Sequence, residues 1–184
     1  MGSVELKVLL VFAVSLLFRF LPFRPPNVEL ILASQIPISK VCGGGISFLF
    51  GVFSILCFDI LTGTLGPWSS ITALAYGSLG LLAASYFKHR STRASTVQFA
   101  IIATILYDAA TGLTIGPLMF NQSFFAALLG QIPFTLMHLL GNIAFALLWS
   151  PLLARFLEPR EEGTGASLSR SLTLRGEYVP FILK

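Results

Sequence analysis

Residues 46–67 read ISFLFGVFSILCFDILTGTLGP, and this stretch decides the fold. Asp59 is the one charged side chain in the run 46–61, whose length approaches the roughly 20 residues that a helix needs to cross a bilayer. The Thr-Gly and Gly-Pro pairs that follow are turn signals. The stretch therefore predicts a membrane-spanning helix that ends in a tight connection.

The rest of the chain has the same apolar character. Of its 184 residues, 55 % are hydrophobic and 11 % are charged, which is more apolar surface than a soluble domain can hide. We expect an all-α membrane protein in which residues 1–157 form one transmembrane domain and the polar residues 158–184 form a flexible cytoplasmic tail. Proline and glycine breaks divide the domain into a compact bundle of six transmembrane helices, at 6–23, 27–41, 46–61, 68–87, 96–113 and 133–156, with a short outer element at 123–129.

The distribution of Lys and Arg predicts the orientation. Six spans place both termini on one side, and positive residues favour the cytoplasmic side. We therefore expect a protein of the cytoplasmic (inner) membrane with both termini cytoplasmic and with the connections 23–28, 62–68 and 114–124 outside. The first apolar run has no small-residue cleavage site after it, so we expect a retained span. The outer set then holds Arg19 and Arg24, and the cytoplasmic set holds Lys7, Lys40, Lys88, Arg90, Arg93, Arg155 and Arg160.

An internal repeat links two of the predicted spans. Residues 58–67 (FDILTGTLGP) are echoed by residues 107–117 (YDAATGLTIGP), with one extra residue in the second copy. Both copies fall at the outer ends of odd-numbered spans, which predicts a parallel duplication of a two-helix unit, as transporter folds often have. The matched positions are Asp59, Thr62 and Gly63 in the first copy and Asp108, Thr111 and Gly112 in the second.

Asp59 and Asp108 are carboxylates inside predicted spans. A charge at membrane depth is costly unless it faces a cavity or a partner, so contact with a ligand is one interpretation. The other is structural, because each Asp precedes Thr-Gly by three positions and could accept bonds from backbone groups freed where a helix ends. The use of the same feature twice favours the structural interpretation.

The last predicted span carries a polar face. Gln131, Thr135, His138 and Asn142 are spaced by four, three and four residues, which places them on one side of a helix. Four stacked polar groups favour one wall of a substrate-binding pocket, although a single His can also bond across to a neighbouring helix. Aromatic walls for such a pocket are available in Trp68, Tyr76 and Tyr107, and Trp68 is equally suited to be an interfacial anchor.

Enzymatic motifs are absent from the sequence. It contains no HExxH, no GxSxG and no phosphate loop, so we expect neither catalysis, nor a cofactor, nor a metal site. The Thr-Gly after each Asp differs from the Gly-Asp arrangement expected of an intramembrane aspartyl protease. Cys42 and Cys57 form no CxxC and are expected to be small apolar side chains. The positive charges lie in short runs beside apolar segments, which indicates membrane topology and no nucleic acid partner.

Residues 20–157 resemble the substrate-binding S components of energy-coupling factor (ECF) transporters, which take up vitamins. The resemblance rests on five stretches: Pro-Asn-Val-Glu-Leu (26–30), Asp59-x-x-Thr-Gly with Gly66-Pro67-Trp68, Ala75-Tyr76-Gly-x-x-Gly80, Tyr107-Asp108, and His138-x-x-Gly-Asn142. It implies six spans, a pocket near the outer leaflet that holds a small molecule such as a vitamin, and a transmembrane coupling subunit with two cytoplasmic ATPases.

One feature departs from that family. S components often carry Ala-x-x-x-Ala in the first span for docking to the coupling subunit, whereas Ala13 is followed here by Leu17. Small-residue pairs occur instead in the span 68–87, at Ala73/Gly77 and Gly80/Ala84. We expect a membrane-embedded substrate-capture subunit, and the alternative is a non-transport scaffold subunit of a cell-envelope assembly, similar to the rod-shape MreD family.

Overall fold

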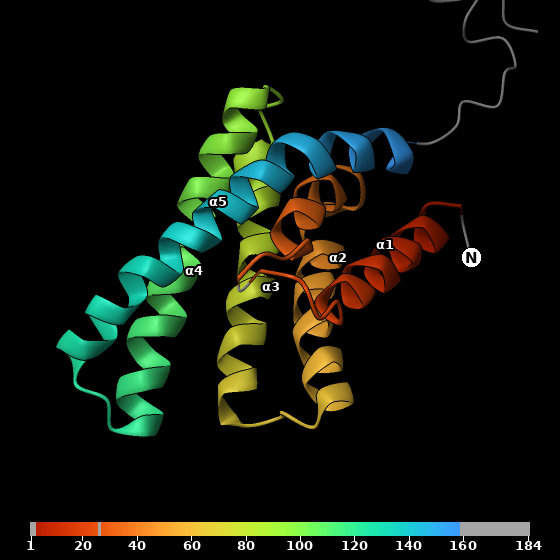
Figure 1. Cartoon of the computed structure of the whole chain (residues 1–184). Helices are drawn as coiled ribbons and strands as arrows, with labels where there is room; N and C mark the ends of the chain where they lie inside the picture. The colour runs from red at the N-terminus through yellow and green to blue at the C-terminus, as the bar shows by residue number, and fades with distance from the viewer. Residues whose placement is uncertain (1–2, 26, 159–184) are drawn as a thin grey trace, which may run out of the picture.

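The computed structural model describes residues 3–25 and 27–158, and within these ranges it contains helices and no strands. Four of its five helices are long and apolar enough to cross a membrane, namely α2, α3, α4 and α5. The described part of the chain is thus an all-α integral membrane protein, and the prediction of six transmembrane helices is not supported. In chain order the helices are α1 (Ser3–Arg19), α2 (Ile31–Thr62), α3 (Pro67–Phe87), α4 (Arg93–Phe120) and α5 (Phe124–Leu157) (Figure 1).

The six-span prediction first differs from the structure at α2, which covers the two predicted spans 27–41 and 46–61. Its backbone leaves the helical region at Gly43 (φ 83°, ψ 172°), so the expected break at the glycine triplet is present. The segment before this break is only about 18 Å long at 1.5 Å per residue, whereas the hydrocarbon core is about 30 Å thick. Residues 31–39 are all buried among other helices. Hydrophobicity alone cannot distinguish such an interior helix from a lipid-facing span.

The prolines of the last two helices also do not act as predicted. α5 continues through Pro133 and Pro151, so residues 123–129 form no separate outer element, and α4 continues through Pro117 to Phe120. Neighbouring helices and small local adjustments can satisfy the backbone groups that a proline frees inside a membrane, so a proline there bends a helix more often than it ends it.

The proposed two-helix repeat is not supported, because its two copies lie in different structural settings. In the first copy, Gly63 adopts a left-handed conformation (φ 70°) and ends α2, and Thr64 N–H donates to the Asp59 carbonyl at 2.8 Å. In the second copy, Thr111 and Gly112 lie inside α4, which continues to Phe120. Gly112 packs against the side chain of Gln131. Helix packing against α5 therefore overrides the local stop signal.

Small residues let α2 and α3 approach closely. A Cβ at Gly80 would lie 2.6 Å from the Ser47 backbone, and a Cβ at Gly51 would lie 2.8 Å from the Tyr76 carbonyl oxygen. Close backbone approach of this kind drives helix association in membranes. The small residues of α3 thus serve packing within this chain, with Gly77 against Phe48.

The two described ends of the chain meet. Lys7 Nζ donates to the Glu158 carbonyl oxygen at 2.9 Å, and the Lys7 ammonium lies 5.5 Å from the centre of the Phe156 ring. Figure 1 shows the start of α1 and the end of α5 on the same side of the bundle. The predicted tail, apart from Glu158, lies outside the described residues.

Candidate functional site

α4 and α5 hold an ionisable pair in the interior of the bundle. Asp108 Oδ1 lies 2.7 Å from His138 Nδ1, and each residue is 1 % exposed. The two atoms form one hydrogen bond, in which His138 Nδ1–H donates when Asp108 is a carboxylate. Two ionisable side chains buried this deeply in a membrane bundle are costly unless each satisfies the other or serves a function.

A second polar pair lies one helical turn away on both helices. Asn142 Nδ2 donates to Thr104 Oγ1 at 2.8 Å, and the Thr104 hydroxyl donates to the Ala100 carbonyl at 2.7 Å. Positions 104 and 108 of α4, and 138 and 142 of α5, are each four residues apart, so the two pairs stack along the helix interface.

These pairs leave polar atoms unused. Asp108 Oδ2, His138 Nε2 and Asn142 Oδ1 are buried, and none of them has a hydrogen-bond partner among the described residues. A buried polar atom without a partner costs about 1–3 kcal/mol. Three such atoms on adjacent side chains form a set of unpaired polar positions inside the bundle.

Aromatic rings join this cluster to α3 and to the segment before α2. The Tyr76 and Tyr107 ring centroids are 4.2 Å apart, and Tyr107 meets the His138 ring edge-on at 5.7 Å. The Tyr76 hydroxyl donates to Glu29 Oε1 at 2.9 Å, and Glu29 Oε2 lies 3.5 Å from Arg19 Nε. We call this connected set the buried polar core, and it consists of Arg19, Glu29, Tyr76, Thr104, Tyr107, Asp108, His138 and Asn142.

Five of the eight predicted substrate-binding residues belong to the buried polar core. Gln131 and Thr135 lie beside it, half-buried, with Gln131 Nε2 donating to Thr135 Oγ1 at 3.3 Å. They line a hollow of about 310 Å³ between α4 and α5. Trp68 lies apart from the core, with its ring 5.8 Å from that of Phe120. The five core members among the predicted residues are Tyr76, Tyr107, Asp108, His138 and Asn142.

The remaining repeat residues stay outside the core or serve the backbone. Asp59 is half-buried in the last turn of α2, where its carbonyl caps the helix. Thr62 Oγ1 donates to the Phe58 carbonyl at 2.8 Å, and Thr111 Oγ1 donates to the Tyr107 carbonyl at 2.9 Å. Each threonine hydroxyl thus donates to the carbonyl four residues earlier. The helices differ, because α2 ends at Thr62 whereas α4 continues past Thr111.

Sequence reasoning assigned no role to Thr104 or to the Arg19–Glu29 ion pair. Thr104 precedes Asp108 by one turn, so a polar residue spaced by four from an intramembrane Asp was an available signal. Glu29 is a carboxylate within a predicted span, which is the feature that singled out the two aspartates. Its pairing with Arg19 joins residues from separate segments, and such pairing is visible only in three dimensions.

The described residues contain no group of three His, Cys, Asp or Glu side chains placed to hold a metal ion. The fold and the buried polar core define the class: an integral membrane helix bundle with ionisable side chains in its interior. Comparisons of the chain with known protein families, with curated proteins and with solved structures find no match.

Proposed function

We propose that the chain is a substrate-capture subunit of a small-molecule uptake transporter, similar to the ECF S components. The single observation that carries the proposal is the set of unpartnered buried atoms on Asp108, His138 and Asn142. A ligand that supplies a donor to each acceptor would satisfy them, and would gain affinity and selectivity together. Under this proposal the partner is a transmembrane coupling subunit with two cytoplasmic ATPases.

The aromatic pair supports a flat ligand. The Tyr76 and Tyr107 rings pack against each other beside the polar atoms, and rings of this kind also stack on heterocycles. The hollow between α4 and α5 lies next to the core, since its lining residues Ala109 and Thr135 are within one turn of Asp108 and His138, which do not themselves line it. Its volume of about 310 Å³ falls at the lower end of the range of small-molecule sites. A vitamin-sized heterocycle is the ligand class that fits these features.

Mass spectrometry of the purified protein tests the proposal. The purified chain is expected to retain a small molecule that is released on denaturation. Replacing Asn142 with Leu should weaken its rebinding by roughly thirty-fold, about 2 kcal/mol, because a ligand partner is lost. Gln131→Leu, at the edge of the core, is the matched control and should have a smaller effect. Equal effects of the two variants, or a folded wild-type chain that binds no small molecule, would contradict the proposal.

A scaffold subunit of a cell-envelope assembly is the second candidate. The observation that favours it is that Asp108 bonds His138 and Asn142 bonds Thr104, so the polar side chains already fasten α4 to α5 without a ligand. If the scaffold role holds, Asn142→Leu should lower the unfolding temperature of the ligand-free protein. The capture role instead predicts that this variant mainly reduces the stabilisation that added ligand gives.

A further inference from the structure

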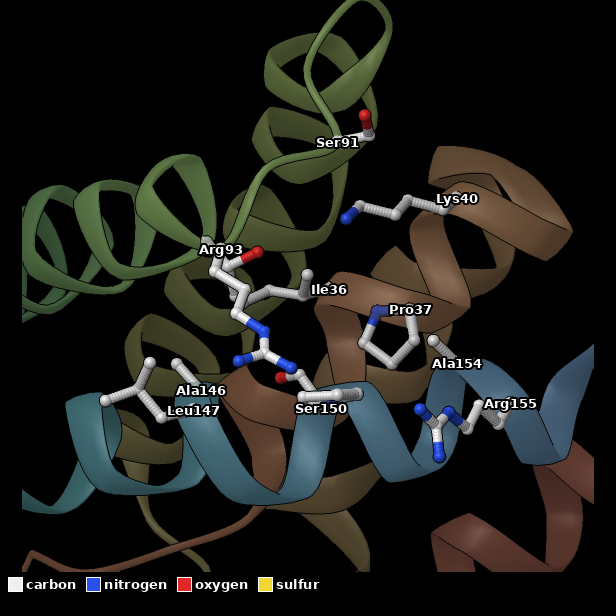
Figure 2. A pocket seen from close by; sticks show the side chains of 12 residues that line it. Ile36, Pro37, Lys40, Ser91, Arg93, Ala146, Leu147, Ser150, Ala154 and Arg155 are labelled. Carbon is white, nitrogen blue, oxygen red and sulfur yellow. The ribbon is translucent and has the colours of Figure 1, made fainter.

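A pocket at the other end of α5 combines three positive side chains. Its volume is about 260 Å³, and it lies between the first half of α2, the start of α4 and the C-terminal third of α5. Lys40 comes from α2, Arg93 from α4 and Arg155 from α5 (Figure 2). We call it the basic pocket, and it shares no residue with the buried polar core.

None of the three cations is neutralised within the described part of the chain. No acidic residue lines the pocket, and the ion pairs Arg19–Glu29 and His138–Asp108 involve none of the three cations. The Lys40 ammonium lies 4.1 Å from the centre of the Phe87 ring, a contact that holds the cation in place and leaves its charge uncompensated. Three positive charges around one cavity repel one another, and a bound anion would relieve that repulsion.

The donors of the pocket select for charge. Three hydroxyl groups line the pocket, and two of them already use their hydrogens: Ser150 Oγ donates to the Ala33 carbonyl at 2.6 Å and Thr96 Oγ1 donates to the Thr92 carbonyl at 3.2 Å, with Ser91 as the third. The cationic side chains are therefore the main donors of the pocket. Arg93 and Arg155 carry planar guanidinium groups, which bind phosphate oxygens in pairs. Arg93 is also the first residue of α4, where the helix dipole favours an anion.

We propose that the basic pocket binds a phosphate group, presented either by an anionic lipid headgroup or by a soluble phosphate compound. The apolar part of the lining supports an anion attached to an apolar body, since Leu147 lines the pocket and is 46 % exposed. Basic pockets between membrane helices are also a recurring way to hold phosphate-bearing lipid heads. The site is independent of the proposed capture function.

Native mass spectrometry of the full chain in detergent tests the phosphate site. Phosphatidylglycerol should remain bound to the wild-type protein in preference to the zwitterionic phosphatidylcholine. The double variant Arg93→Gln/Arg155→Gln should bind phosphatidylglycerol at least roughly tenfold more weakly, because two charge-assisted contacts are lost. Lys88→Gln removes one exposed positive charge that does not line the pocket and is the control that should bind as wild type. The single variants Arg93→Gln and Arg155→Gln serve if the double variant does not fold.

Inorganic phosphate separates the two sources. Competition by millimolar phosphate, with loss of this competition in the arginine variants, indicates a site for soluble phosphate compounds. Retention of phosphatidylglycerol in the presence of the same phosphate indicates a lipid headgroup site. Equal binding of the two lipids together with no effect of phosphate overturns the proposal. Equal losses in Lys88→Gln and in the arginine variants also overturn it.

Discussion

The two intramembrane aspartates show how much the role of one residue depends on its neighbours. Asp108 is 1 % exposed and bonds His138, whereas Asp59 is half-buried at a helix end. Both stand in the same local sequence, aromatic-Asp-x-x-Thr-Gly. The local sequence therefore predicts two equivalent carboxylates, and the packing of α5 against α4 makes only one of them part of the buried polar core.

Asp108→Asn tests this difference. The amide keeps the size of the side chain and removes the charge that faces His138, so stability should fall by about 1–3 kcal/mol. Asp59→Asn is the matched control, and we expect less than about 0.5 kcal/mol there, as for most surface changes. The measurement is the unfolding midpoint in one detergent. Equal losses in both variants would restore the parallel structural roles that the repeat suggested.

Tyr76→Phe tests the link between α3 and Glu29. The change removes the hydroxyl that donates to Glu29 Oε1 at 2.9 Å and leaves a part-buried carboxylate oxygen without that bond. The stability should fall by about 1–3 kcal/mol. Tyr86→Phe removes an exposed hydroxyl bond to Gln98 and should change the unfolding midpoint little. A silent Tyr76→Phe variant would show that the Glu29 oxygen finds another donor.

At the scale of the helices, close approach of backbones decides which elements pack. α3 presents Gly77 and Gly80 to α2, so the two helices meet with no side chain between their backbones at Ser47. The prediction of a helix at 68–87 is confirmed by α3 (Pro67–Phe87). It could be made from the local sequence, because Gly66 and Pro67 mark the start of the helix. The boundaries of α2, α4 and α5 were predicted less well, because glycines and prolines there remain inside helices.

Gly80→Ala tests the close packing of α2 on α3. The new methyl would lie 2.6 Å from the Ser47 backbone, so the helices must separate, and we expect a loss of about 1–3 kcal/mol. Gly130→Ala is the control in α5, where no atom lies within 4 Å of the added Cβ. There the higher helix propensity of Ala should leave stability unchanged or raise it by up to about 1 kcal/mol. Comparable losses in both variants would argue against tight α2–α3 contact.

At the scale of the whole molecule, the two ends of the bundle differ in charge. Lys40, Arg93 and Arg155 surround the basic pocket, whereas the connections at 63–66 and 121–123 carry no charged residue. In Figure 1 these two connections lie at the end of α3 and α4 remote from the connection between α3 and α4. The positive-inside tendency therefore predicts that the basic pocket lies at the cytoplasmic face.

Thiol labelling of intact cells tests this orientation. Ser91→Cys and Asn121→Cys lie at opposite ends of α4, and Cys42 and Cys57 are first replaced by Ala. A membrane-impermeant reagent should label position 121 from outside and should reach position 91 only after the cells are opened. Labelling of both positions from outside would show that α4 does not cross the membrane. Labelling of position 91 alone would reverse the orientation.

The amino-acid sequence by itself determined the class of this protein, since long apolar helices with few charges report a lipid environment without any knowledge of contacts. It also placed His138 and Asn142 on one helical face, because that spacing is a property of a single helix. Only the tertiary structure decided that residues 31–39 form an interior helix and that Glu29 joins Tyr76 in the core. The physical reason is that burial and polar pairing depend on which segments meet in space. Segments far apart in the chain carry no local signal of that meeting.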